Sequence, residues 1–140
     1  AVRLAFARAE ATDEMLVGAT GGRLDHLLAN LFIPTQPRFA AYTNHIELCD
    51  RQNLVRFYQP GTYRLDPMPT YHYLGIVPLT AIDRLNIRKA KYVLENWSSQ
   101  TPFAWASNEF VGQRPVEISW QAGVVAVIYS RDRFGQQVDN

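Results

Sequence analysis

The feature that most constrains the fold is a change of residue pattern near Gln52. Toward the C-terminus, short runs rich in Val, Ile and Tyr are separated by Asn, Asp, Gly and Pro. The runs are NLVRFYQ (53–59), GTYRLD (61–66), YHYLGIVPLT (71–80), VEISWQ (116–121) and GVVAVIYS (123–130), and the similar run HIELCD (45–50), just before Gln52, fits either half of the chain. Runs of this length and spacing are typical of an antiparallel β-sandwich or barrel. The sequence therefore predicts an all-β domain over residues 53–140, with hairpin turns at residues 50–53 and 59–61.

The region before Gln52 follows a different pattern. Residues 1–10 are rich in alanine and predict a helix, and residues 14–19 predict a short buried strand. Residues 21–33 predict a second helix, because at about 100° per residue its leucines fall within one third of the circumference. These leucines are Leu24, Leu27, Leu28 and Leu31, and the helix ends before Pro34 and Pro37. The order helix, strand, turn, helix predicts that residues 1–52 are the C-terminal part of an α/β unit built on a parallel sheet.

Composition excludes several classes of protein. The chain has 140 residues, of which 47% are apolar and 19% charged, as in an ordinary folded domain. The net charge is +1 without a basic block, so no nucleic-acid partner is expected. No apolar run approaches the ~20 residues of a membrane helix, so no membrane partner is expected either. Cys49 is the single cysteine, which favours a reducing, cytoplasmic location.

The turn between the predicted strand and second helix has the features of an anion site. It holds three glycines, Gly18, Gly21 and Gly22. Glycines let a backbone approach a phosphate, and the unpaired amides of a helix N-terminus favour negative charge. Thr20 and Arg23 can donate hydrogen bonds to phosphate oxygens, and Asp25 can orient a hydroxyl or hold a metal. The glycine spacing fits neither Walker A nor the dinucleotide fingerprint, and the alternative is a tight turn beside a surface ion pair.

The whole stretch GATGGRLDHLLANL (18–31) resembles the signature of bacterial thiamine pyrophosphokinases. Three later stretches resemble other parts of that family in the same order. They are YQPGTYRL (58–65), YLGIVPLT (73–80) and the pair AKYVLEN (90–96) with ASNEF (106–110). The resemblance implies the tail of a three-layer α/β catalytic domain in residues 1–52, followed by a thiamine-binding and dimerisation β-sandwich in residues 53–140.

The resemblance also implies an activity and its partners. The family transfers pyrophosphate from ATP to the hydroxyl of thiamine with Mg²⁺, giving thiamine diphosphate and AMP. It forms homodimers, and thiamine binds where the subunits meet. The family's metal-binding aspartates belong to a stretch upstream of a helix like the one at Ala1, so no metal ligand is expected in this chain. The chain is therefore expected to be an incomplete, inactive fragment, which would not be a monomer.

Under this resemblance, the catalytic residues are Asp25, which meets the attacking hydroxyl, and Arg23, which balances phosphate charge. Thr20, Gly21, Gly22 and His26 would contact the nucleotide phosphates. The residues implied for thiamine are Ser107, Asn108, Tyr92 and Lys91.

Each of these assignments has a structural alternative. The Ser-Asn pair is also common in turns, and Tyr92 can equally fill an interface. Trp97 and Trp105 are expected to be core or interface anchors. A departure lies at Lys89-Ala90, where many relatives have Gly-Leu. The alternative function is a non-catalytic sandwich that binds a small ligand or mediates dimerisation.

Overall fold

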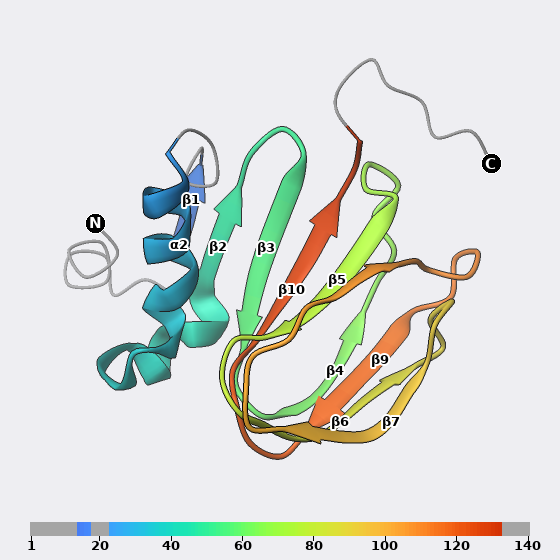
Figure 1. The fold of residues 1–140 in the computed structure, drawn as a ribbon. Coiled ribbons are helices and arrows are strands. Elements are labelled where there is room, and N and C mark those ends of the chain that lie inside the picture. The colour runs from blue at the N-terminus through green and yellow to red at the C-terminus, as the bar shows by residue number, and fades with distance from the viewer. Residues whose placement is uncertain (1–13, 18–22, 133–140) are drawn as a thin grey trace.

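The computed structural model describes residues 14–17 and 23–132, which form two β-sheets and a short helical region (Figure 1). The helical region comprises α2 (Leu24–Phe32) and two 3₁₀ helices, η1 (Ile33–Thr35) and η2 (Pro37–His45). The strands are β1 (Glu14–Val17), β2 (Ile46–Cys49), β3 (Asn53–Tyr58), β4 (Gly61–Leu65), β5 (Tyr73–Pro78), β6 (Ile82–Arg88), β7 (Leu94–Ser99), β8 (Trp105–Asn108), β9 (Val116–Trp120) and β10 (Val125–Ser130).

The strands form one six-stranded and one four-stranded sheet. The larger sheet has the order β1-β2-β3-β10-β5-β8, and the smaller has the order β4-β9-β6-β7. Strands β1 and β2 pair in parallel, whereas the other described pairs are antiparallel. The described chain is thus mostly antiparallel β-structure with few helices, and the predicted β-sandwich is confirmed. The boundary predicted at Gln52 falls in the turn between β2 and β3 and stays a prediction, as does the α/β catalytic domain.

The sandwich core follows from alternating side chains on strands of both sheets. On β9, Val116, Ile118 and Trp120 are buried while the residues between them are partly exposed. The same cluster includes Leu74 and Ile76 of β5, Leu85 and Ile87 of β6, and Val125, Val127 and Tyr129 of β10. Each sheet therefore hides one apolar face against the other, as expected for two packed antiparallel sheets. Burial raises the pKa of the Tyr129 phenol from 10.0 to about 12.

The helical region packs less completely. Leu31 and Ile33 contact a second buried cluster, which includes Ile46 and Leu48 of β2 and Phe57 of β3. In contrast, no residue of α2 is buried, and Leu24 keeps 68% of its surface exposed. The leucine face predicted from the sequence is therefore only partly used in the described chain. Among the described residues, no helix has the length and apolar character needed to cross a membrane.

Three strands were not among the predicted runs: β6, β7 and β8. Non-glycine residues with left-handed backbones interrupt the two-residue alternation of each strand, with φ of 56° at Arg84, 47° at Asn96 and 60° at Ser107. Register shifts accompany them in the β6–β7 and β5–β8 pairs. Bulges of this kind remove the periodic signal from which strands are predicted.

The two predicted hairpin turns have different outcomes. The turn at residues 50–53 joins the paired strands β2 and β3, and the Asp50 carboxylate accepts the backbone N–H groups of Gln52 and Asn53, each at 2.8 Å. The turn at residues 59–61 is not a hairpin, because β3 and β4 belong to different sheets. Pro60-Gly61 instead carries the chain from one sheet to the other.

Candidate functional site

The first group of predicted site residues lies at the start of α2. Arg23 precedes the helix in an extended conformation, and Leu27 donates the first helical hydrogen bond to its carbonyl oxygen at 3.2 Å. The Arg23 guanidinium lies 2.6 Å from the Asp25 carboxylate, and these side chains are 72% and 59% exposed. Asp25 also accepts the backbone N–H of His26 at 3.0 Å. This geometry is the surface ion pair named as the alternative, and it leaves both charged groups open to a ligand.

The remaining phosphate-binding residues predicted for this turn, Thr20, Gly21 and Gly22, lie outside the described residues, as does the helix predicted at residues 1–10. The structure thus gives the helix end and its charged pair. The anion site itself stays a prediction.

The second group centres on Asn108, at the end of β8. Its side chain is 5% exposed and is bonded to the backbone on both sides of Tyr92. The amide nitrogen donates to the Tyr92 carbonyl at 2.8 Å, and the amide oxygen accepts the Tyr92 N–H at 3.0 Å and the Glu109 N–H at 2.9 Å. One side chain therefore replaces the pairing that a neighbouring strand would supply, and it fixes the backbone of Tyr92 relative to β8.

Lys91 and Glu109 extend this connection. The Lys91 N–H donates to the Glu109 carbonyl at 3.0 Å, and the Lys91 ammonium donates to the Glu109 carboxylate, also at 3.0 Å. That side-chain hydrogen bond raises the pKa of Lys91. The other carboxylate oxygen of Glu109 lies 3.3 Å from Nε2 of His72. Glu109 was not among the predicted site residues, and the only signal for it was its place after Ser-Asn in ASNEF.

An apolar cavity of about 250 Å³ lies beside this connection, between β7 and β8. Tyr92, Trp105 and Asn108 line it, together with Ile87 and Leu94. Tyr92 is 58% exposed, so its ring forms an open wall. The Trp105 ring packs edge-on against Trp97 at 5.3 Å between centroids, and its buried indole N–H has no hydrogen-bond partner among the described residues. Trp105 therefore packs within an aromatic cluster and also borders the apolar cavity.

Ser107 lies next to the cavity's lining in sequence, with an exposed side chain and φ of 60°. A left-handed serine is unfavourable by roughly 1 kcal/mol, and the neighbouring bonds of Asn108 hold it in place. Strained residues of this kind cluster at binding sites. The structure thus brings Lys91, Tyr92, Ser107 and Asn108 into one neighbourhood, and their assignment to thiamine stays a prediction.

The two groups of predicted residues are not brought together in one chain. The helix α2 packs through Leu31 on the β2–β3 side of the six-stranded sheet, whereas β8 forms the opposite edge (Figure 1). At about 4.8 Å between strands, the β1 and β8 edges lie roughly 24 Å apart. A small molecule cannot touch both groups in a single copy of the chain.

The described residues provide no evident metal centre. Within residues 14–17 and 23–132, no three His, Cys, Asp or Glu side chains are grouped so that they could hold a metal ion. A hard cation such as Mg²⁺ takes oxygen ligands from carboxylates and phosphates. The described side chains do not form such a cage.

Known proteins resemble the chain in both sequence and fold. Residues 62–125 match the family described as "Thiamin pyrophosphokinase, vitamin B1 binding domain". The thiamine pyrophosphokinase of Bacillus subtilis (strain 168) is 30% identical over 120 residues, which are 84% of this chain and 54% of that protein. A solved thiamin pyrophosphokinase family protein from Enterococcus faecalis superposes with a TM-score of 0.89 and 42% identity, covering 95% of this chain and 62% of the other. The solved thiamine pyrophosphokinase of Bacillus subtilis superposes with a TM-score of 0.78 and 26% identity, covering 94% of this chain and 62% of the other.

The matched residues run from β4 to the first residue of β10, so the sandwich is of the vitamin B1-binding class. Over most of its length the chain is similar to bacterial thiamine pyrophosphokinases. It spans about half the length of the curated relative that it matches.

Proposed function

We propose that this chain takes part in the transfer of pyrophosphate from ATP to thiamine. The observation that carries the proposal is the match of residues 62–125 to the vitamin B1-binding domain, supported by the 0.89 TM-score of the Enterococcus relative. In this reaction the thiamine hydroxyl attacks the β-phosphorus of ATP. The bond between that phosphorus and the oxygen bridging to the α-phosphorus breaks, so that AMP leaves and thiamine diphosphate forms.

Arg23 and Asp25 supply the chemistry at the helix end in this proposal. The Asp25 carboxylate holds the attacking hydroxyl and accepts its proton, and the Arg23 guanidinium balances charge on the transferred phosphates. Their exposed 2.6 Å ion pair supports these roles, because the pair opens toward solvent rather than into the core. Thr20, Gly21, Gly22 and His26 would contact the nucleotide phosphates. Mg²⁺ bound to ATP would supply charge neutralisation on the phosphates.

Thiamine would occupy the cavity between β7 and β8. Its rings suit an apolar space walled by Tyr92 and Trp105, and Ser107 offers a hydroxyl at the rim. The bonds of Asn108 use its amide oxygen and one N–H, which leaves the second N–H as a donor to a ring nitrogen. Lys91 holds Glu109 and thereby the segment that carries Tyr92.

A homodimer is the third part of the proposal. The α2 group and the β8 group lie at opposite edges of the larger sheet, so a complete site needs residues from two copies of the chain. In this arrangement, residues 1–52 of one copy act on thiamine held by the sandwich of its partner.

The test is formation of AMP and thiamine diphosphate by the full encoded protein. Asp25→Asn is expected to lower kcat at least 100-fold while leaving thiamine affinity within about twofold, because Asp25 acts in the chemical step. The matched control is Asp66→Asn, which breaks a similarly exposed pair two residues apart, Arg64–Asp66 at 3.2 Å. It is expected to leave activity unchanged. Thiamine binding without turnover by the folded full protein would instead favour the non-catalytic binding module.

A further inference from the structure

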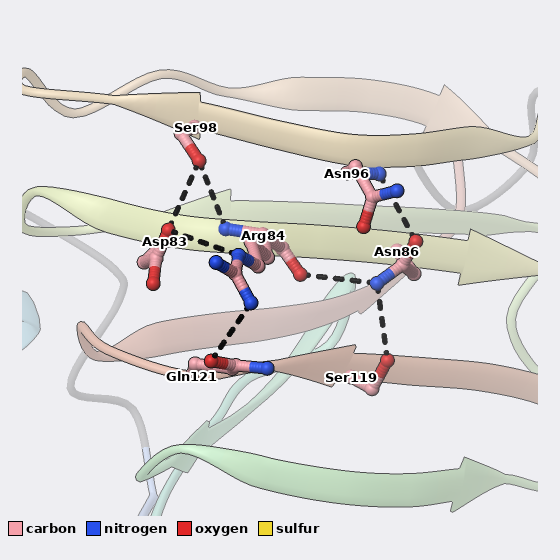
Figure 2. Close-up of polar contacts among 7 residues, drawn as sticks. All are labelled: Asp83, Arg84, Asn86, Asn96, Ser98, Ser119 and Gln121. Atoms are coloured by element: carbon pink, nitrogen blue, oxygen red, sulfur yellow. Dashed lines mark hydrogen bonds and ion pairs between the residues drawn. The ribbon is translucent and has the colours of Figure 1, made fainter.

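The outer face of the four-stranded sheet divides into two parts with different electrostatics. Along β6, β7 and β9 the polar side chains satisfy one another (Figure 2). Asn86 donates to the Arg84 carbonyl at 3.0 Å and to the Ser119 hydroxyl at 3.4 Å, and it accepts the Asn96 N–H at 3.0 Å. Arg84 lies 3.9 Å from Asp83 and donates to Gln121 at 3.5 Å. This part has no excess of either charge.

The other part of the face is a groove of about 470 Å³ at the ends of β4 and β6 and the start of β9. Three cationic side chains line it: Arg64 from β4, Lys89 just after β6, and Arg114 just before β9. Glu117 is the carboxylate in the lining, and it lies 3.8 Å from the Lys89 ammonium. Arg88 stands directly opposite Glu117 in the β6–β9 register. The groove therefore concentrates positive charge in a chain whose net charge is only +1.

Two of the three cations have carboxylate partners, Glu117 for Lys89 and Asp66, at 3.2 Å, for Arg64, whereas Arg114 is held by the backbone. The Arg114 guanidinium donates to the Lys89 carbonyl at 3.3 Å, and among the described residues no carboxylate lies within ion-pair distance of it. Lys89 has φ of 66°, a conformation that is unfavourable for lysine by roughly 1 kcal/mol. The hydrogen bond from Arg114 joins two turns that are 25 residues apart, so both cations face the same space.

We propose that this groove binds the phosphate group of a small molecule. Arginine forks match phosphate oxygens, and the Thr62 hydroxyl in the lining adds a further donor. The volume falls within the range of small-molecule sites, about 300–1,000 Å³. Glu117 repels a bare anion but accepts a hydroxyl, which favours phosphate esters that carry hydroxyl groups. The groove and the β7–β8 cavity share no lining residue, so this inference does not depend on the proposed function.

The test is titration of the full encoded protein with glycerol 3-phosphate, a phosphate ester that carries hydroxyl groups, followed by amide NMR shifts at residues 62–64, 89 and 114–117. Saturable shifts are expected in these segments, separately from any at the start of α2. Arg114→Gln is expected to raise the Kd at this site about tenfold, and Arg64→Gln to raise it by a smaller factor. Arg51→Gln removes the same charge in the β2–β3 turn and is expected to leave the Kd unchanged.

Absence of saturable shifts in the groove would overturn the proposal. Equal weakening by Arg51→Gln would also overturn it, because it would show attraction to net charge rather than to a site. If Arg114→Gln disturbs the fold, as seen from amide shifts across β9, Arg64→Gln decides. An unchanged Kd in that variant counts against the groove.

Discussion

The sandwich and the helical region of this chain differ in how completely they bury their apolar residues. In the sandwich, strands of both sheets contribute fully buried side chains such as Leu74, Leu85 and Ile118. In the helical region, α2 buries no residue, and Leu24 and Phe32 remain largely exposed. Stability thus resides mainly in the sandwich, while the charged pair proposed for catalysis lies on a weakly packed edge. The residues proposed to bind thiamine therefore lie in the well-packed part of the chain, and the pair proposed for catalysis lies in the weakly packed part.

The largest expected effect is a loss of stability when a core side chain is truncated. Ile118→Ala should lower the free energy of unfolding by about 4 kcal/mol, because it removes a fully buried side chain and leaves a cavity. Leu24→Ala, its counterpart on α2, should change it by less than about 0.5 kcal/mol. Urea unfolding followed by tryptophan fluorescence measures both. Similar losses in the two variants would show that the regions are equally packed.

The next effect is a loss of stability at high pH. The folded-state pKa of Tyr129 is about 12, against 10.0 when unperturbed, so the fold favours the neutral phenol. This preference stabilises the fold by about 2–3 kcal/mol below pH 10, and the stabilisation is lost as the pH rises toward 12. Between these pH values the free energy of unfolding should therefore fall more steeply with pH in wild type than in Tyr129→Phe. Tyr42→Phe, in the helical region, is the control, and an identical pH profile for Tyr129→Phe would contradict the assignment.

A smaller loss of stability, together with weaker thiamine binding, is expected when Asn108 is replaced. Asn108→Ala removes three hydrogen bonds to the backbone and should lower the free energy of unfolding by about 2 kcal/mol. Because Tyr92 then loses its support, thiamine should bind about tenfold more weakly. Asn108→Asp keeps the acceptor oxygen but places a carboxylate oxygen against the Tyr92 carbonyl in a buried position, so it should be at least as destabilising as Asn108→Ala. Calorimetric titration measures the affinity, and wild-type affinity in Asn108→Ala would remove Asn108 from the site.

The smallest expected effect is a gain in stability. Lys89→Gly should raise the free energy of unfolding by about 1 kcal/mol, because glycine adopts the observed φ of 66° without strain. Lys89→Asn should give a smaller gain, since asparagine tolerates this conformation better than lysine. Thermal unfolding detects both changes. A destabilised Lys89→Gly would show that the lysine stem contributes packing that outweighs its backbone strain.

Much of the fold follows from local sequence patterns, and the exceptions have physical causes. The strands that alternate cleanly, such as β9 with Val116, Ile118 and Trp120, are predictable from two-residue periodicity. Strand β6 is not, because the left-handed Arg84 shifts the phase between Ile82 and Leu85. The passage of the chain from one sheet to the other at Pro60-Gly61 also cannot be predicted, because the residues of a turn do not show which strands pair with each other.

In the candidate site, too, some features follow from the sequence and others depend on the topology. Motif resemblance named Tyr92 and Asn108 separately, and the structure shows that they are bonded to each other. The partner of a side-chain amide 16 residues away cannot be predicted from the motif, because the contact depends on the pairing of β8 with its neighbours. The separation of Asp25 from Asn108 across the sheet is likewise a property of topology alone.

Mixing two defective variants of the full encoded protein tests whether the proposed catalytic pair of one copy serves the sandwich of another. Asp25→Asn supplies an intact sandwich, and Tyr92→Ala supplies an intact catalytic pair. With random exchange of subunits in a twofold dimer, half of the dimers are mixed, and each has one intact site. Activity at limiting thiamine should therefore recover to about a quarter of the wild-type value. No recovery, with subunit exchange verified by mass spectrometry, would show that each site is built within a single chain.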